Sequence, residues 1–551
     1  MKNQYDVAII GGGLAGLTLS LQLKKENQNL SIIVLEMRAG DAPDAAHKVG
    51  ESTVELGTHY IREVLDLKDY LDEHQLPKHG LRFFFTPQHK DDITKRVELG
   101  PRERLPIPSH QIDRGTFENE LIKRAKALDV DVFLGAKVIA SELDEKQNKV
   151  TYTIAGEEKT ITSSWVVDAS GRSSFLKRKL GLKKELDHAV SSAWFRVKGE
   201  IDIDKWSDNA EWNSFLKPGL RRLGTVHFMD KGYWVWLIPL ATGNTSVGIV
   251  ADPKFHPFNT YNKLDKAMDW LAENEPLCYK FLKEKKDDVL DFKVLKHFAH
   301  HTEKLYSTER WALTGESGLF LDPFYSPGTD FIAINNTFIT DLIVRENKGE
   351  DIHLRTNVFE QTHFSLFNNW VPIYQNKYSL WGSTQTMVMK IFWDWATYWS
   401  VPTLLFTNEG LTDINVLRAL FSKETKAGQK FGKLNAQMQD LFVEWSEYDT
   451  ETFTNRYIDP FDLEFLRTFH KGLDIQHPTK ELIKKVEDNV VLLEQIATTI
   501  FRLMSKKVNN TPLNIEVNPY QMSLKNASST IVENDKIEAS IVKDVEKMWF
   551  Y

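Results

Sequence analysis

The stretch "YDVAIIGGGLAGLTLSLQLKK", residues 5–25, decides the fold of the N-terminal part of the chain. A short apolar run ends at a glycine-rich turn and continues into a helix-forming segment, and a second strand follows in "LSIIVLE", residues 30–36. Gly11, Gly13 and Gly16 have the spacing G-x-G-x-x-G, which allows a tight turn and lets a pyrophosphate approach the helix N-terminus. The pattern predicts a Rossmann-type β-α-β unit that binds a dinucleotide.

An acidic residue in register with the glycines supports this prediction. Glu36 ends the second strand, twenty residues after Gly16, where a carboxylate can accept hydrogen bonds from ribose hydroxyls. We also assign Ala15, inside the glycine motif, and Arg38, just beyond the second strand, to the nucleotide site.

Two later stretches favour FAD over NAD. "WVVDASGRSSFLKRKLG", residues 165–181, contains Asp168, and "WALTGESGLFLDP", residues 311–323, places Gly315 and Glu316 after an apolar strand. Both resemble the later FAD motifs of flavoprotein monooxygenases. That family usually has Asp where this chain has Glu316, so the carboxylate is kept on a longer side chain. We predict that all three residues contribute to FAD binding.

Composition limits the function classes. The chain has 551 residues, enough for two or three domains, and a formal net charge of -8, which argues against non-specific binding to nucleic acid. Cys278 is the single cysteine, so no internal disulfide can form. The first five residues are polar and a strand pattern follows at once, so we expect no secretory signal, no transmembrane segment and a cytoplasmic location.

The pattern of elements changes along the chain. Residues 1–345 read as an α/β core, with a β-rich substrate module at about 80–110 and 185–300 interleaved with the nucleotide-binding part. From about residue 346 to residue 551 the pattern is mainly helical. We therefore predict a Rossmann-type FAD-binding domain, an interleaved β-rich module and a helical C-terminal region.

The most apolar long segment is residues 381–406, and it contains Lys390 and Asp394 near its middle. Charges in that position are unfavourable in a bilayer. One interpretation is a buried helical pair that ends before Pro402, and the alternative is an aromatic patch that touches a membrane or a partner protein.

Four motifs together resemble the flavin-dependent halogenases, a branch of the FAD monooxygenase superfamily. They are the glycine motif at residues 11–16, "GEST" at 50–53, "WVWLIP" at 234–239, which fits W-x-W-x-I-P, and "FLDPFYSPG" at 320–328, which fits F-x-x-P-x-x-S-x-G. The resemblance covers roughly residues 5–345. It places Ser52 and Arg114 near the flavin and implies an oxidoreductase of secondary metabolism.

The resemblance also implies a chemistry. A separate NAD(P)H-dependent flavin reductase supplies reduced FAD, O2 adds to give a C4a-hydroperoxide, and chloride or bromide attacks it. Hypohalous acid then travels through a tunnel to a lysine beside a small aromatic substrate. Lys78, five residues before Phe83, matches the family's spacing for that lysine. A buried ammonium suits the task because it donates hydrogen bonds and its pKa falls on desolvation.

Further residues take roles through the same resemblance. Trp234 and Trp236 wall the substrate away from the flavin, although tryptophans alternating along a strand also fit an ordinary core. Ser326, Gly328 and Thr329 surround the halide, and Gly328 also borders the flavin.

Two positions in "FLDPFYSPG" depart from the family pattern. Tyr325 stands where members that modify tryptophan carry Glu, so a phenol-like substrate is favoured over free tryptophan. Pro327 stands where the family offers a backbone N–H to the halide, and proline has none. Loss of one charge-assisted hydrogen bond costs about 1.5–3 kcal/mol, a roughly 10- to 150-fold weaker halide site.

Three histidines in "HFAHH", His297, His300 and His301, lack a carboxylate or cysteine at ligand spacing. We interpret them as solvent-facing residues at a strand end and predict no metal site.

The sequence therefore supports an FAD-dependent halogenase of an electron-rich aromatic. Two alternatives stay open: a hydroxylase or epoxidase on the same scaffold that uses no halide, and a flavoprotein that acts on a protein-bound or carrier-bound aromatic.

Overall fold

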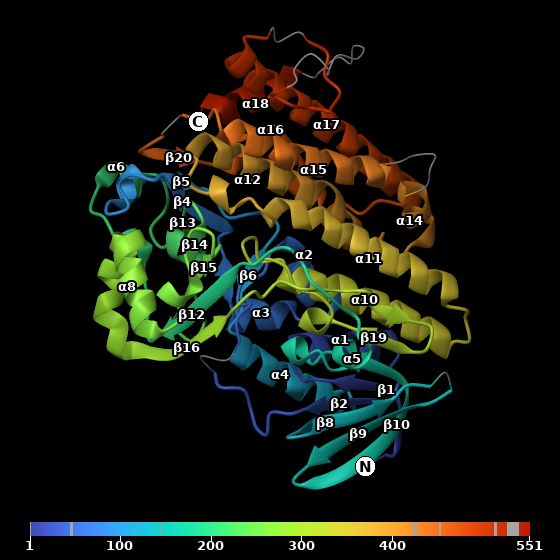
Figure 1. The fold of residues 1–551 in the computed structure, drawn as a ribbon. Coiled ribbons are helices and arrows are strands. Elements are labelled where there is room, and N and C mark those ends of the chain that lie inside the picture. The colour runs from blue at the N-terminus through green and yellow to red at the C-terminus, as the bar shows by residue number, and fades with distance from the viewer. Residues whose placement is uncertain are drawn as a thin grey trace.

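The computed structural model describes residues 2–44, 48–144, 146–421, 427–450, 453–511, 515–525 and 539–550. Figure 1 shows three layers along the long axis of the molecule: the nucleotide-binding sheet near the N-terminus, a second sheet in the middle, and a stack of helices at the opposite end.

The first sheet is built around the strand that carries the glycine motif. β1 (Gln4–Ile10) lies between two parallel neighbours, β2 (Ile32–Glu36) and β10 (Glu157–Asp168). The sheet continues through β7 (Asp131–Leu134) on one side and β19 (Trp311–Leu313) on the other. β1 is buried on both faces, which explains its continuous apolar run. Its C-terminal end is a switch point of the strand order, where nucleotides bind in folds of this kind.

The sheet is extended and covered by neighbouring elements. β8 (Lys137–Glu142) and β9 (Asn148–Ile154) form an antiparallel extension beside β10, and β18 (Tyr306–Ser307) pairs with β19. The helix α1 (Leu14–Glu26) follows the glycine turn and packs against α4 (Arg114–Ala127) and α10 (Gly328–Asn347).

The second sheet joins strands that are far apart in sequence. Its order is β16-β12-β15-β14-β13-β4-β5-β20. The bounds are β16 (Val289–Leu295), β12 (Ser191–Val197), β15 (Thr245–Ala251), β14 (Tyr233–Pro239), β13 (Thr225–Asp230), β4 (Leu81–Phe85), β5 (Val97–Leu99) and β20 (Arg456–Ile458). The strand β20 comes from the helical C-terminal region, so that region and the β-rich module share one sheet.

Strand alternation gives this sheet two distinct faces. On β14, Tyr233, Val235 and Leu237 pack in a small core under α8 (Leu264–Asn274) and α9 (Pro276–Leu282). Trp234, Trp236 and Ile238 face the main core of the molecule. The two tryptophans are therefore directed toward the first sheet.

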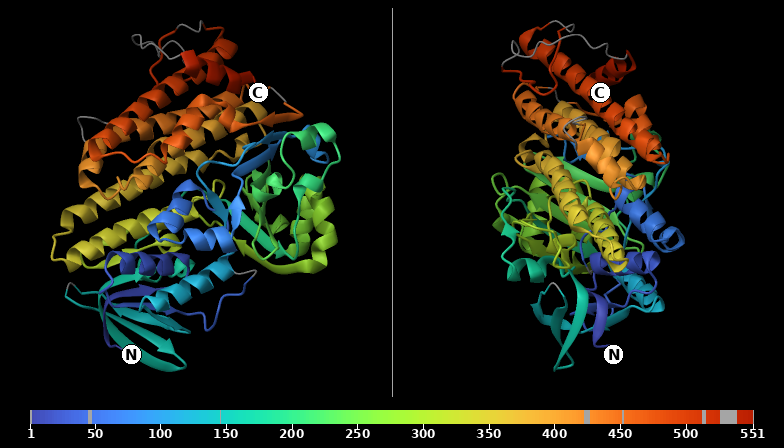
Figure 2. Two further views of the ribbon diagram at one scale, coloured as in Figure 1. Left: turned by 180° about the vertical axis from the view of Figure 1, so that it is seen from behind. Right: turned by 90° about the vertical axis from the view of Figure 1, so that its right-hand side faces the viewer.

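The C-terminal region is a layered set of helices, seen edge-on in Figure 2. Its longer members are α11 (His353–Tyr374), α12 (Thr384–Tyr398), α15 (Ala427–Ser446), α16 (Glu464–Gly472), α17 (Thr479–Asn509) and α18 (Ala539–Phe550). Their buried side chains belong to the same apolar core as those of α1 and α10. The predicted fold class is confirmed. The predicted division at residues 345 and 346 falls in the last turn of α10.

The apolar segment around Lys390 is a buried helix, as the first interpretation held. Lys390 and Asp394 form an ion pair of 2.8 Å inside the protein, and each side chain is 1% exposed. The predicted end before Pro402 is wrong: α12 continues into a π-helical turn, Trp399–Thr403, and then into α13 (Leu404–Thr407). The wider π-helical turn accommodates the missing N–H and the ring of Pro402, which a regular α-helical turn would not.

Candidate active site

The turn after β1 excludes side chains at two of its three motif glycines. Gly11 has φ +109°, and a Cβ there would lie 2.4 Å from the carbonyl oxygen of Ala169. A Cβ on Gly16 would lie 2.1 Å from the carbonyl oxygen of Gly11. Both glycines are therefore required by the packing of the turn against the neighbouring strand and helix.

The third glycine borders open space instead. A Cβ on Gly13 would approach only the side-chain ends of Lys48, at 2.9 Å, and Glu118, at 4.0 Å. A Cβ at this position would enter the space that a pyrophosphate needs at the helix N-terminus. Glu36 lies beside the turn, where its carboxylate accepts hydrogen bonds from the N–H groups of Gly12 (2.6 Å) and Arg38 (2.8 Å). These residues fit a dinucleotide.

A cleft runs from the start of α1 to the start of α10. It is lined by the predicted flavin-site residues Ser52, Arg114, Gly315, Glu316 and Gly328, and by Trp234 and Trp236, which were predicted to wall off the substrate. The Nη1 atom of Arg114 donates to the carbonyl oxygen of Val49 at 2.9 Å, which fixes the guanidinium at the edge of the cleft. The cleft joins a glycine turn to a helix N-terminus, and this arrangement can accept both ends of an extended dinucleotide.

Two predicted flavin residues support the cleft from behind. The carboxylate of Asp168 accepts hydrogen bonds from the N–H groups of Ser170 (2.9 Å) and Leu176 (2.6 Å), and burial raises its pKa. Asp168 is absent from the cleft lining, so its carboxylate shapes the turn after β10. Ala15 lies against Gly315, where an added Cβ would be 3.0 Å from the Cβ of Ala15.

The loop "FLDPFYSPG" separates this cleft from a second pocket. Ser326 has φ +61° and Pro327 has φ -78° and ψ 0°. A left-handed residue beside a helical one turns consecutive N–H groups toward one point, the geometry of an anion-binding nest. Here the N–H of Ser326 donates to the carbonyl oxygen of Pro323 at 2.9 Å, and Pro327 has no N–H. Gly328 and Thr329, at the start of α10, keep amides without an intrahelical acceptor.

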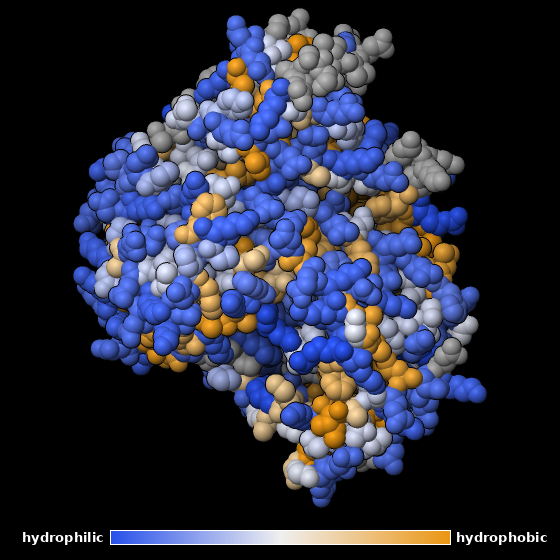
Figure 3. Space-filling model, in the orientation of Figure 1, coloured by the Kyte–Doolittle hydropathy of each residue, from blue (hydrophilic) through white to orange (hydrophobic). Residues whose placement is uncertain are grey.

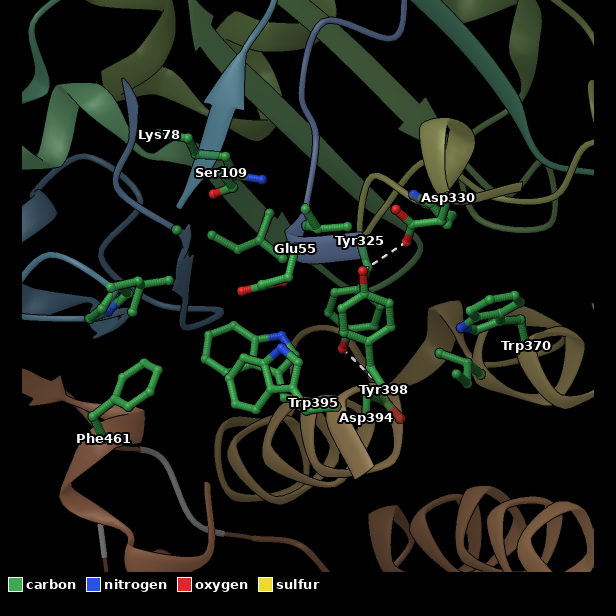
Figure 4. A pocket seen from close by; sticks show the side chains of 18 of the residues that line it. Glu55, Lys78, Ser109, Tyr325, Asp330, Trp370, Asp394, Trp395, Tyr398 and Phe461 are labelled. Carbon is green, nitrogen blue, oxygen red and sulfur yellow. Dashed lines mark hydrogen bonds between the residues drawn. The ribbon is translucent and has the colours of Figure 1, made fainter. Parts of the chain in front are cut away.

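The second pocket lies on the other side of the loop. Tyr325 and Pro327 line it, and Pro327 lines the flavin cleft as well. Its walls are rich in aromatic side chains from the helical region: Trp370, Tyr374, Trp395, Tyr398, Trp399 and Phe461. Figure 4 shows these rings around a space that Glu55 and Lys78 enter from the opposite side. The pocket therefore suits an aromatic molecule that carries a polar substituent.

Lys78 ends in this pocket and is linked to the cleft. β3 (Leu76–Lys78) is buried at its last residue, and the Nζ atom donates to the Ser52 hydroxyl (2.9 Å) and to the carbonyl oxygen of Thr53 (2.7 Å). The Ser326 hydroxyl donates to the same Ser52 hydroxyl at 3.0 Å. A chain of polar groups thus connects the lysine to the loop, and Ser52 and Ser326 both line the flavin cleft.

Burial shifts the pKa values of Lys78 and of a neighbouring carboxyl group. It lowers the pKa of Lys78 to about 7, against the attraction of Glu55 and Asp330. Burial also raises the pKa of Asp330 to about 7, although the Tyr398 hydroxyl and the Gly57 N–H donate hydrogen bonds to its carboxylate. Perturbed groups of opposite charge in one pocket are typical of catalytic sites.

Tyr325 is held by the helical region. Its hydroxyl donates to Asp394 at 2.8 Å, and the carboxylate of Asp394 also accepts from Lys390 and from the Gln439 amide at 2.7 Å. The buried Lys390–Asp394 pair therefore fixes one side of the loop that separates the two chambers.

The two tryptophans of "WVWLIP" line the flavin side only. The Nε1 atoms of Trp234 and Trp236 donate to the hydroxyls of Tyr378 and Ser246, each at 3.1 Å. Trp234 contacts Phe324 of the loop edge-on, with ring centroids 5.4 Å apart. The structure thus places the tryptophan pair on the cleft side, with Trp234 packed against the loop.

The remaining predicted features lie outside the two chambers. His297 is exposed as expected, whereas His300 and His301 are half-buried, which corrects the prediction for these two. The ring nitrogens of His300 contact the carbonyl oxygens of Phe298 (3.1 Å) and Glu316 (2.9 Å), because its strand packs beside the flavin motif. In the described part of the chain, no helix is long and apolar enough to cross a membrane. The face in Figure 3 is mostly hydrophilic, with scattered apolar patches.

Comparison with known proteins shows an FAD binding domain and a similarity to halogenases. Residues 4–246 match the model of an FAD binding domain. The flavin-dependent halogenase chlA of Dictyostelium discoideum is 29% identical over 437 residues, which span 72% of this chain and 70% of that protein. A 1H-pyrrole-2-carbonyl-[peptidyl-carrier protein] brominase of Pseudoalteromonas luteoviolacea is 26% identical over 66% of this chain and 82% of that protein. The chain carries an FAD binding domain and is similar to flavin-dependent halogenases over about two thirds of its length or more. It is an FAD-dependent oxidoreductase.

Two solved halogenase structures share the fold of this protein. The halogenase PltM in complex with phloroglucinol and FAD has a TM-score of 0.64 at 14% identity and covers 88% of this chain and 96% of its own. The flavin-dependent brominase Bmp2 has a TM-score of 0.54 at 20% identity, over 68% of this chain and 87% of its own.

Sequence reasoning missed several residues that the fold brings to the pocket. Asp330 follows the "FLDPFYSPG" motif by two residues, and Glu55 follows "GEST" by two, so proximity to a motif was an available signal. His470 contacts Glu55 from α16, and no local pattern distinguishes it from a surface histidine.

Proposed function

We propose that the protein is an FAD-dependent halogenase that acts on an electron-rich, phenol-like aromatic. The observation that carries the proposal is Lys78, buried between the flavin cleft and an aromatic pocket and bonded to the Ser52 hydroxyl at 2.9 Å. O2 would be the oxidant, and bound reduced FAD would activate it by supplying two electrons, so that the remaining two-electron oxidising equivalent converts halide to hypohalous acid. We expect a separate flavin reductase to provide the reduced cofactor.

The chain's own residues then bind, separate and orient the reactants. The amides of Gly328 and Thr329 hold the halide at the positive end of α10. The hydroxyls of Ser52 and Ser326 offer hydrogen bonds along the route to Lys78. Its ammonium hydrogen-bonds the oxygen of hypohalous acid and orients the halogen toward the ring in the aromatic pocket. The loop and the tryptophan pair keep the substrate away from the flavin.

The substrate class follows from the pocket walls and from Tyr325. The aromatic lining offers stacking to a ring, and Tyr325, fixed by Asp394, occupies the loop position of a glutamate in relatives that modify tryptophan. The carrier-bound pyrrole substrate in the name of one relative raises the possibility of tethered substrates. Each aromatic should therefore be tested both free and as a carrier-protein thioester.

A second candidate is a hydroxylase that uses no halide, and Pro327 favours it because the halide nest lacks one N–H. One experiment separates the two. The full chain receives enzymatically reduced FAD, O2 and bromide with a panel of phenols, and products are identified by mass. Brominated products that require bromide support the halogenase. Products formed in halide-free buffer that carry oxygen from labelled dioxygen support the hydroxylase and reject the halogenase.

A further inference from the structure

Three carboxylates line the aromatic pocket: Glu55, Asp330 and Asp394. Asp330 accepts hydrogen bonds at both oxygens, from the Gly57 N–H at 2.8 Å and from the Tyr398 hydroxyl at 2.9 Å. Both oxygens of Asp394 are used by protein donors as well. Protein donors therefore already engage every oxygen of these two carboxylates.

Glu55 is placed differently. It is the first residue of α2 (Glu55–His59), and its carboxylate points into the space between Lys78 and the rings of Trp395 and Phe461 (Figure 4). Its one ion-pair contact within the described residues is with the Nε2 atom of His470, 3.3 Å from its Oε1. A carboxylate directed into a pocket lined by aromatic rings can accept a hydrogen bond from a bound molecule.

His470 reaches this position from the helical region. It lies on α16, is completely buried, and contacts the rings of Trp399 and Phe461 edge-on at centroid distances of 4.8 and 5.2 Å. Neither ring nitrogen has a hydrogen-bond partner in the described part of the chain, so Nε2 meets Glu55 at ion-pair distance without hydrogen-bond geometry. In the described part of the chain, Glu55 is the one polar side chain found in contact with this buried imidazole. The imidazole therefore acts on the Glu55 carboxylate.

The two environments separate the carboxyl groups near Lys78 chemically. Burial opposes ionisation of Glu55, but His470, the backbone of Glu55 and the charge of Lys78 together lower the pKa of Glu55 below its usual value. Asp330 instead has its pKa raised to about 7 by burial. Two carboxyls with pKa values pushed apart are typical of a base and a group that stays partly protonated.

We propose that Glu55, held by His470, accepts the hydroxyl proton of a phenolic substrate while Lys78 presents hypohalous acid to the ring. This inference rests on the proposed function and refines its substrate class to aromatics that carry a free hydroxyl. It also gives the C-terminal helices a part in the reaction, because His470 is a positioning residue that they supply.

The step balances as follows. A ring carbon attacks the halogen, so a carbon–halogen bond forms and the oxygen–halogen bond of hypohalous acid breaks. The phenolic proton moves to Glu55, and the departing hydroxide takes a proton from the Lys78 ammonium to give water. The ring then loses the proton from its halogenated carbon to Lys78, and the oxygen regains its proton from Glu55. The net change is phenol plus hypohalous acid to halophenol plus water.

The test pairs each phenol with its methyl ether. In the wild type, the phenol should react much faster than the ether. Glu55→Gln keeps the size of the side chain and should slow the phenol about 100-fold or more, the usual contribution of general base catalysis. The ether has no hydroxyl proton for Glu55 to accept, so Glu55→Gln should slow its reaction less than about tenfold. Equal losses for phenol and ether in Glu55→Gln would overturn the inference.

Two further measurements distinguish this failure from a failure of the proposed function. Hypohalite release without substrate, followed with a trapping reagent, reports halide oxidation alone, and its absence in the wild type would reject the halogenase.

Calorimetric binding of the phenol and the ether to the full chain needs no turnover. Glu55→Gln should weaken binding of the phenol about tenfold, the loss expected for one hydrogen bond to a charged group, and leave binding of the ether unchanged. Equal affinities in both proteins would again overturn the inference. Glu63→Gln, the same change at an exposed site of the adjoining π-helical turn, is the matched control.

A pH profile tests His470. Glu55 is faced by His470 from α16, Lys78 from β3, Asp330 from α10 and Tyr398 from α12. In His470→Asn, burial of Glu55 is no longer offset, so its pKa should rise and the acid side of the phenol rate profile should move to higher pH. Lys78 and Asp330 titrate in both proteins, so the difference between the two profiles is the readout. Superimposable profiles would remove His470 from the proposal.

Discussion

The flavin cleft and the aromatic pocket use different parts of the polypeptide. The cleft relies on backbone: a glycine turn at one end, and the amides of Gly328 and Thr329 at the other. The pocket relies on side chains, with Lys78 and carboxylates buried among aromatic rings. Every residue except proline carries a backbone N–H, and a ligand can approach it closely where no Cβ is in the way. A buried charged side chain, in contrast, needs partners that stabilise its charge. The cleft is therefore fixed by glycines, and the pocket by a network that spans the molecule.

The largest expected effect is on the pocket side. Lys78→Met removes the ammonium, and the rate of product formation should fall at least about 1,000-fold, as for loss of a principal hydrogen-bond donor to a reacting group. Reoxidation of reduced FAD by O2 should stay within about twofold, because Lys78 lies beyond the loop. Product analysis and stopped-flow absorbance measure the two rates. Lys126→Ala, at an exposed site on α4, is the control. Normal turnover in Lys78→Met would place the essential lysine elsewhere.

The next effect tests the cleft. Gly13→Ala should weaken FAD binding by about tenfold or more, at roughly 1.4 kcal/mol per decade, because its Cβ enters the pyrophosphate space. The flavin-free protein should keep its melting temperature, since that Cβ meets only flexible side-chain ends. Gly40→Ala, whose Cβ meets nothing within 4 Å, is the matched control. Flavin titration that cannot tell Gly13→Ala from Gly40→Ala would contradict the assignment.

These two chambers also differ in how far the sequence predicts them. The nucleotide end of the cleft could be predicted because its glycines and Glu36 sit at fixed spacing within residues 11–36, whereas Arg114 was placed through the family resemblance. Lys78 was accessible only through family spacing. Glu55 and His470 are 415 positions apart and meet through the packing of α16 beside α2, a tertiary contact that no local period encodes. The predicted helix end before Pro402 was wrong because a π-helical turn accommodates this proline. We used no sequence signature for such a turn.

A smaller effect is expected at the loop between the chambers. Pro327→Ser restores one backbone N–H to the nest beside Gly328. If the wild-type reaction requires halide, the bromide concentration for half-maximal rate should fall about tenfold, the lower bound for one charge-assisted hydrogen bond. Bromide titration of both proteins gives this value. A wild-type enzyme already saturated at micromolar bromide would refute the weakened nest.

The smallest effect concerns stability. The pKa of Lys78 is lowered from 10.5 to about 7 in the folded protein, so protonation favours the unfolded chain. This destabilisation is full below about pH 7 and fades as pH rises toward 10.5. Lys78→Met should therefore raise the melting temperature by about a few degrees at pH 6–7, and by less at pH 9. Thermal unfolding at the two pH values measures the difference. If Lys78→Met were less stable than the wild type at pH 6, the inference that the buried Lys78 ammonium destabilises the folded protein would be wrong.

The shared wall at Pro327 has a consequence for the durability of the protein. Hypohalous acid oxidises thiols and thioethers readily, and the described residues that line the two chambers include no cysteine or methionine. In the proposed reaction the oxidant passes serine hydroxyls on its way to Lys78 and then enters a pocket lined by the indole rings of Trp370, Trp395 and Trp399. When no substrate occupies the pocket, electron-rich carbon atoms of these rings are exposed to the oxidant. Self-inflicted damage should accumulate there, so the number of turnovers that one molecule survives depends on how well its substrate shields them.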